Sequence, residues 1–179
     1  MADTIHDGIR TFVESDKPVV AAVQVAVAGG VLGLMLTADY IVASPRAKFV
    51  SRYANIGLTP DLGVSTLLPA AIGQTRALRL LLQDETIDAE TALDWGLVTE
   101  LAVDPAARAA EVAGFWLDNA TAAFGQAARL IRAGARRTFA DNLADEARTI
   151  GAAFDTPEAK ARVAAFAQAS TSRTPKEKA

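Results

Sequence analysis

The stretch KPVVAAVQVAVAGGVLGLMLTAD, residues 17–39, decides the fold of this chain. It opens with an apolar run rich in valine, passes through the Gly29-Gly30 pair and carries no charge between Lys17 and Asp39. The valine run predicts a buried strand over 19–23, and the apolar residues after the glycines predict a buried helix. The stretch therefore reads as a strand, a tight turn and the start of a helix.

The glycine pair is the first feature that points to chemistry. Because glycine has no Cβ atom, a bound group can approach the backbone of Gly29 and Gly30 closely. The first N–H groups of the following helix point outward and carry partial positive charge. Such a turn can hold an oxyanion. The alternative is that the two glycines only let the strand pack closely against the helix.

Composition narrows the possible partners and location. The formal net charge is −3, which gives no electrostatic reason to expect nucleic acid or an anionic membrane as a partner. With no cysteine and a single histidine, His6, which we expect in a frayed start of the chain, the sequence predicts no metal site. Gln24 and the glycines divide the long apolar stretch, and no signal-like segment opens the chain, so we expect a cytoplasmic protein without a membrane span.

The order of patterns along the chain predicts an α/β front and a helical back. We expect three regions: a partial α/β core at 1–102, a helical oligomerisation region at 103–169 and a disordered tail at 170–179. Within the core the patterns predict helices and short strands. The helices are expected at 7–15, from 65 onward, at 75–82 and from a cap at Asp88 to Gly96, and the strands at 41–43 and 48–50.

Three segments in this order resemble the crotonase (enoyl-CoA hydratase/isomerase) superfamily. They lie at 17–44, 47–73 and 76–102, and a fainter match continues to about residue 170. The resemblance implies a crotonase-like α/β fold, a ββα spiral core followed by a C-terminal helical region. Relatives place further strands and a helix before the Lys-Pro-Val strand, so we expect an N-terminally truncated form of that fold. The resemblance also implies a homotrimer or a dimer of trimers.

The resemblance also implies a substrate. Members of the superfamily bind an acyl-CoA thioester and stabilise an enolate with two backbone N–H groups. One of these maps onto Gly30, and the other lies in an earlier loop with no counterpart here. Coenzyme A enters as part of the substrate, and no separate cofactor is implied.

The acids distinguish the branches of the superfamily. The two glutamates that position water in enoyl-CoA hydratases fall on Gly33 and Tyr53, so the usual hydration pair is missing. Asp61, in the turn Thr59–Gly63, matches the single carboxylate of the enoyl-CoA isomerase branch and the nucleophilic Asp of a haloaroyl-CoA dehalogenase. One carboxylate is enough to move a proton from C2 to C4 of an enoyl thioester. The alternative is that Asp61 is an ordinary turn residue bonded to its own backbone.

The sequence thus predicts an isomerase-type enzyme with Asp61 and Gly30 as catalytic residues. The residues expected to bind the substrate are Gly29, Tyr53, Leu58 and Leu62. Two other functions stay open. One is a hydratase-like reaction, and the other is a truncated, non-catalytic homologue that acts as an oligomer partner.

Several other polar or aromatic residues have mainly structural interpretations. We expect Asp39 to be a structural carboxylate at the end of the apolar helix and Trp95 to lie in the core. Ser51 and Arg52 read as a solvated loop. Three arginines of the C-terminal helices read either as a solvated helix face or as contacts for coenzyme A phosphates, and they are Arg132, Arg136 and Arg137.

Overall fold

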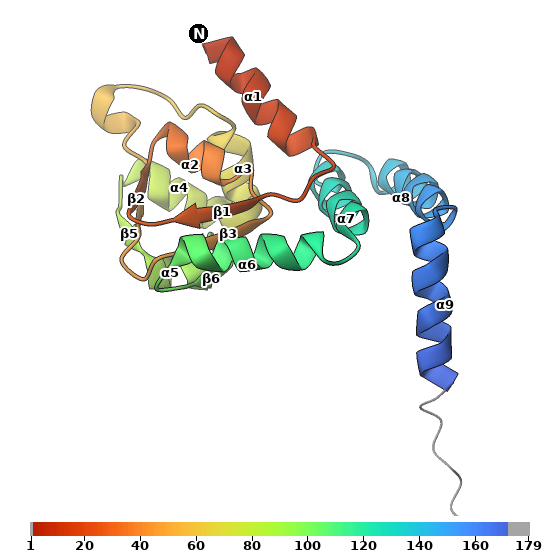
Figure 1. Ribbon diagram of the computed structural model, residues 1–179. Helices are drawn as coiled ribbons and strands as arrows, with labels where there is room; N and C mark the ends of the chain where they lie inside the picture. The colour runs from red at the N-terminus through yellow and green to blue at the C-terminus, as the bar shows by residue number, and fades with distance from the viewer. Residues whose placement is uncertain (1, 172–179) are drawn as a thin grey trace, which may run out of the picture. The chain divides into compact units, whose positions relative to one another are not determined.

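The computed structural model describes residues 2–171 (Figure 1). They divide into two compact units, and the boundary in the sequence falls between Ala135 and Arg136. The larger unit holds all the strands of the described chain. Its elements are α1 (Ala2–Glu14), β1 (Val20–Val23), β2 (Ala26–Ala28), α2 (Gly30–Met35), β3 (Tyr40–Ala43), β4 (Lys48–Val50), the 3-10 turn η1 (Ala54–Ile56), α3 (Val64–Ile72), α4 (Gln74–Leu82), β5 (Ile87–Asp88), α5 (Ala89–Asp94), β6 (Glu100–Leu101), α6 (Pro105–Leu117) and α7 (Thr121–Gly134).

The strands form two small sheets that the chain visits in turn. One sheet has the order β1-β3-β6 with all strands parallel, and the other has the order β2-β4-β5 with β5 antiparallel. The first two passes each contribute one strand to each sheet and then a helix, as β1-β2-α2 and β3-β4-α3, whereas in the third α5 lies between β5 and β6. This is the ββα repeat that the family resemblance implies, although β2 was not predicted as a separate strand.

Local signals explain where the elements end. Lys17-Pro18 follows α1, where proline cannot continue a helix. The side chain of Asp88 accepts a hydrogen bond from the Thr91 N–H and so caps α5, as predicted. Gly96 follows α5 with a φ of 79°, a left-handed conformation that favours glycine.

The core fills the space between the sheets and helices α2 to α5. Its largest fully buried apolar side chains come from α2, β4, α3, α4 and the segment after α5, and they are Leu32, Phe49, Leu68, Leu80 and Leu97. Helix α6 contacts β1 and β3, and Figure 1 shows it running along that sheet. Helix α7 contacts α1 and α6.

The smaller unit is helical. It contains α8 (Phe139–Phe154) and α9 (Pro157–Thr171), which contact each other. Of the tail predicted at 170–179, residues 170 and 171 belong to α9, and 172–179 lie outside the described residues. Within residues 2–171, no helix combines the length and hydropathy that crossing a bilayer requires.

Candidate active site

The glycine turn is tied to the end of β4. Gly29 has a φ of 55°, which an L side chain rarely adopts, and its N–H donates to the carbonyl of Ser51 at 2.9 Å. Gly30 is the first residue of α2, so no acceptor inside the helix is available to its N–H. The turn therefore presents the backbone of Gly30 at the start of a buried helix.

The predicted carboxylate lies beside this turn. A Cβ atom placed on Gly30 would lie 3.6 Å from Asp61 Oδ1 and 2.7 Å from Leu62 Cδ1. The structure thus brings together Asp61 and Gly30, the two residues predicted to be catalytic, from segments 31 positions apart. Leu62, predicted to bind the substrate, lies at the same place.

Tyr53 completes this arrangement. Its hydroxyl donates to Asp61 Oδ1 at 2.6 Å, and only 7% of the residue is exposed. Burial, together with the hydrogen bond to Asp61, raises the pKa of Tyr53 to about 12. Tyr53 therefore stays protonated, and remains a donor to the carboxylate, throughout the physiological pH range.

The other glutamate position of the hydratases is closed. A Cβ atom on Gly33 would meet the carbonyl oxygen of Leu62 and would lie 2.8 Å from its Cβ atom and 3.0 Å from its carbonyl carbon. Real Cβ atoms essentially never approach backbone this closely. Gly33 is therefore required by the packing of α2 against the 59–63 turn, and no carboxylate fits there without moving the backbone.

The turn that blocks Gly33 has an unusual backbone and an unexpected neighbour. Leu62 has a φ of 50°, and its N–H donates to Nε2 of His6 at 3.4 Å. The prediction that His6 lies in a frayed start is wrong, because α1 begins at Ala2. Ile9 and Val13, one helical turn apart, are buried residues of this helix.

Tyr53 immediately precedes η1, and Leu58 follows it in the chain. Leu58 is 60% exposed. Its N–H donates to the carbonyl of Tyr53 at 3.0 Å. These contacts all lie within the chain, and none involves a substrate. The substrate-binding roles therefore stay predictions for all four residues, Leu58, Leu62, Gly29 and Tyr53.

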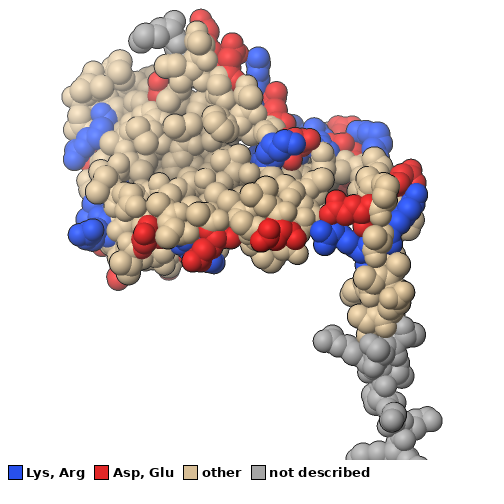
Figure 2. Space-filling view, in the orientation of Figure 1, with Lys and Arg blue, Asp and Glu red and all other residues tan. Residues whose placement is uncertain are grey.

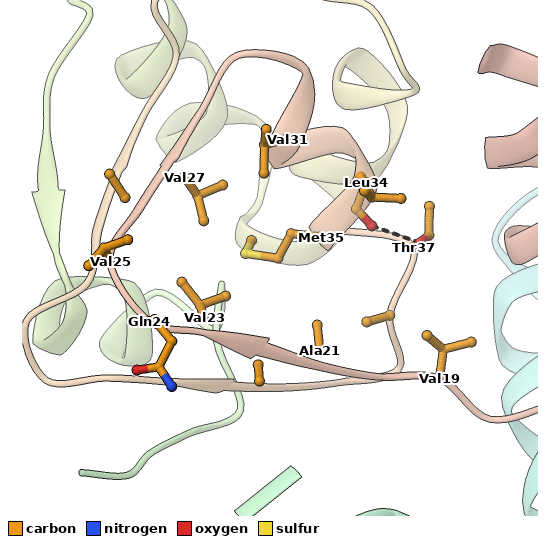
Figure 3. Close-up of a pocket in the computed structure, with 13 residues that line it drawn as sticks. Val19, Ala21, Val23, Gln24, Val25, Val27, Val31, Leu34, Met35 and Thr37 are labelled. Atoms are coloured by element: carbon orange, nitrogen blue, oxygen red, sulfur yellow. Dashed lines mark hydrogen bonds between the residues drawn. The ribbon is translucent and has the colours of Figure 1, made fainter. Parts of the chain in front are cut away.

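An apolar pocket opens between α2 and the strands β1 and β2 (Figure 3). It has a volume of about 330 Å³ and is lined by residues 19 and 21–27 and by Val31, Leu34, Met35, Thr37 and Ala38. Asp61, Tyr53 and Gly30 are not among its lining residues. Figure 2 shows that the face of the larger unit with β1 and α2 bears few charged side chains. Gly30 is nonetheless next to the pocket in the chain, because Val31, the following residue of α2, is one of the lining residues.

Two predictions about polar residues are wrong. Ser51 is 1% exposed and not part of a solvated loop, because its carbonyl accepts the N–H of Gly29. Arg132 does not lie on a solvated face, whereas Arg136 and Arg137 are exposed as predicted. The guanidinium of Arg132, with a side chain 14% exposed, binds Asp39 and the carbonyls of Val13 and Ser15.

The structural interpretation of Asp39 is confirmed. Its Oδ2 accepts the Val19 N–H at 2.8 Å, and its Oδ1 binds Arg132, so the carboxylate joins the start of β1 to α7. Trp95 lies at the margin of the core and not fully inside it, with the guanidinium groups of Arg76 and Arg79 5.6 and 5.4 Å from its ring centroid.

In the described chain, no three side chains among His, Asp and Glu are gathered as a metal site requires. The chemistry that the residues themselves can supply is an acid or base at Asp61, a hydroxyl at Tyr53 and a backbone donor at Gly30.

Comparison with known proteins identifies the family of the chain. The family model described as enoyl-CoA hydratase/isomerase matches residues 1–173. The trans-2-decenoyl-acyl-carrier-protein isomerase of Streptococcus mutans is 43% identical over 82 residues, which are 46% of this chain and 31% of that protein. A probable enoyl-CoA hydratase of Rhodobacter capsulatus is 36% identical over 155 residues, 83% of this chain and 59% of that protein.

A solved structure gives the same result for the fold. The enoyl-CoA hydratase/isomerase of Cupriavidus metallidurans CH34 superposes with a TM-score of 0.88 at 34% identity, over 93% of this chain and 64% of that one. This chain spans less than two thirds of the length of each of these relatives. The ββα core, the glycine turn and the match over nearly the whole chain lead to one conclusion: the chain belongs to the enoyl-CoA hydratase/isomerase family, with the crotonase fold.

Proposed function

We propose that this chain acts on an acyl-CoA thioester as an isomerase, moving a carbon–carbon double bond by a proton shift at Asp61. The observation that carries the proposal is the pairing of Asp61 with Gly30, where a Cβ on the glycine would lie 3.6 Å from Asp61 Oδ1. This closeness supports the proposal, because proton abstraction next to a thioester carbonyl requires a base near a backbone donor.

The proposed reaction needs one base and no water. A 3-enoyl thioester loses a proton from C2 to Asp61, and the electron pair delocalises to the carbonyl oxygen, where the N–H of Gly30 stabilises the negative charge. The same proton returns from Asp61 to C4, which leaves the 2-enoyl isomer. Tyr53 donates to Asp61 Oδ1, and this hydrogen bond orients the carboxylate that exchanges the proton with the substrate.

The closure of the Gly33 position favours isomerisation over hydration. Water addition by the usual pair needs two carboxylates. Leu62 fills the space where one of them would start, and the other position is the phenol Tyr53. The name of the S. mutans relative, an isomerase, points the same way, whereas that of the R. capsulatus relative is a hydratase.

The proposal includes an assembly and a location. We propose a homotrimer or a dimer of trimers, with the exposed apolar residues of α8 at subunit contacts. These are Phe139, Leu143, Ile150 and Phe154, between 51% and 83% exposed. They recur at helical spacing and form one apolar stripe. We also propose a cytoplasmic location and no cofactor besides the coenzyme A of the substrate.

The decisive experiment is Asp61→Asn in the full chain, which keeps the size of the side chain and removes the base. With a medium-chain 3-enoyl-CoA, the isomerisation rate should fall at least about a hundredfold. Asp118→Asn, an exposed carboxylate at the end of α6, is the matched control and should leave the rate unchanged. An unchanged rate in Asp61→Asn, or efficient hydration of a 2-enoyl-CoA by the wild-type chain, would overturn the proposal.

A further inference from the structure

A pair of residues in left-handed conformations lies behind the candidate site. Arg52, with a φ of 61°, immediately precedes Tyr53, and Asp84, with a φ of 48°, lies in the connection between α4 and β5. The antiparallel pairing of β4 with β5 brings the two connections next to each other. L residues rarely adopt such φ values, so the surrounding contacts must hold these conformations in place.

The two residues hold each other through two hydrogen bonds. The backbone N–H of Arg52 donates to Asp84 Oδ1 at 2.8 Å, and its guanidinium Nη1 donates to Asp84 Oδ2 at 2.7 Å. The carboxylate is 18% exposed, whereas the arginine side chain is 55% exposed. These bonds hold the pKa of Asp84 below its usual range, first through the backbone N–H of Arg52. The hydrogen bond from the backbone N–H of Arg52 is therefore better shielded from solvent than the one from its guanidinium.

The residues on either side of Arg52 both contact the candidate site. The carbonyl of Ser51 accepts the N–H of Gly29 at 2.9 Å. The hydroxyl of Tyr53 donates to Asp61 at 2.6 Å. A change of φ at Arg52 would rotate Ser51 and Tyr53 relative to each other, and the two contacts would not both survive.

We infer that Asp84 is a positioning residue, which fixes the backbone of Arg52 and thereby the side chain of Tyr53 against the candidate carboxylate. Asp84 does not touch the predicted reacting atoms and acts through the intervening residue. The positioning is a property of the fold, whereas its effect on rate rests on the proposed function. A surface ion pair without this role would contribute little, since exposed pairs are screened by solvent.

The experiment measures the pKa of Tyr53, which depends on the burial of its side chain and on its hydrogen bond to Asp61. The chain has two tyrosines, so Tyr40→Phe leaves Tyr53 as the only one. With ring-labelled tyrosine, NMR then gives the pKa of Tyr53 in this background. Asp84→Gly is the test variant, because glycine accepts the φ of 48° while the carboxylate is lost. We expect the pKa of Tyr53 to fall by about one unit or more, toward the ordinary value of tyrosine near 10.

Two further variants make the result specific. Glu85→Gln breaks the neighbouring ion pair of Glu85 with Arg79, which has bonds of 2.7 and 2.8 Å, and should leave the pKa of Tyr53 unchanged. Asp84→Asn tolerates the left-handed backbone and keeps one neutral acceptor oxygen, which can still accept the N–H of Arg52 but not the guanidinium as well, so it should lower the pKa of Tyr53 by less. If the glycine variant does not fold, the asparagine variant decides alone.

The outcomes separate this inference from the proposed function. A folded Asp84→Gly or Asp84→Asn protein in which Tyr53 keeps its pKa of about 12 overturns the positioning role. An equal fall in Glu85→Gln overturns it too, because the effect would then be general loosening of the loop. If the parent protein isomerises 3-enoyl-CoA, Asp84→Gly should also lower kcat about tenfold with little change in KM. A fall in the pKa of Tyr53 in a protein without isomerase activity supports the positioning role and counts against the proposed function.

Discussion

The backbone of Leu62 occupies the space that a side chain on Gly33 would need. A Cβ atom on Gly33 would lie 2.8 Å from Leu62 Cβ, and Leu62 itself has a φ of 50°. The turn that carries Asp61 is therefore pressed against α2, and this contact both delivers Asp61 to Gly30 and closes the position of a second carboxylate.

The first prediction concerns this contact. Gly33→Glu should not create a hydratase, because the new side chain would displace the 59–63 turn together with Asp61. The free energy of unfolding should fall by about 1–3 kcal/mol, the usual cost of overpacking. Urea denaturation measures this, with Gly114→Ala as the control. A Cβ atom on Gly114 would meet no other atom within 4 Å, so that variant should keep its stability or gain. A stable Gly33→Glu protein that hydrates 2-enoyl-CoA would contradict the prediction.

The second prediction concerns stability at high pH. The pKa of Tyr53 is raised to about 12 in the folded chain, so between pH 10 and 12 the unfolded chain binds fewer protons than the folded one. The contribution of Tyr53 is fully present below pH 10 and is lost as the pH rises through the folded pKa, a difference of roughly 1–3 kcal/mol. Urea denaturation from pH 8 to 11 should show a shallower decline in Tyr53→Phe than in the wild-type chain. If stability declines equally with pH in both proteins, the raised pKa of Tyr53 is wrong.

A third prediction tests the buried contacts of Arg132. Arg132→Met keeps a long side chain but leaves Asp39 and the two carbonyls without their donor. The free energy of unfolding should fall by about 2–4 kcal/mol, as expected when one partner of a largely buried pair is removed. Arg136→Met, at an exposed position, should change it by less than about 0.5 kcal/mol. Similar losses in the two variants would show that the contacts of Arg132 add no stability.

The fourth prediction concerns the apolar stripe of α8. Light scattering should give three or six times the mass of one chain for the wild-type protein. Ile150→Glu puts a charge on the stripe, at a residue that is 70% exposed, and should lower the mass toward that of one chain. Ala152→Glu, about half a helical turn away and also exposed, is the matched control and should keep the assembly. A wild-type monomer at tens of micromolar would count against the proposed trimer.

Most of the elements in the larger unit follow from local sequence signals. Asp88 predicted its helix because a cap acts within three residues. The valine run predicted β1 because β-branched residues favour strands, but only Val23 of the strand is buried and Ala22 is exposed, since β1 lies at the edge of its sheet. The strand β2 was missed, since its three residues continue the same apolar run without a break in composition.

The candidate site was predicted only in part. Asp61, Gly30 and Tyr53 were named from the family pattern, and the structure places them together. The left-handed backbones of Leu62, Arg52 and Asp84 could not be read from the sequence, because no glycine marks those positions. The same holds for Arg132, whose partners come from segments more than ninety residues away.

Because β1 lies at the edge of its sheet, some of its backbone N–H groups face β3 and the others face away from the sheet. The carbonyls of Val19 and Val23 accept from Asp39, Tyr40 and Ser44 on the side of β3. Since backbone groups alternate along a strand, those of Val20 and Ala22 point to the edge where the described chain places no further strand. Deuterium should therefore enter the strand at every second residue, and the rate of its uptake at Val20 and Ala22 reports directly whether another segment has covered that edge.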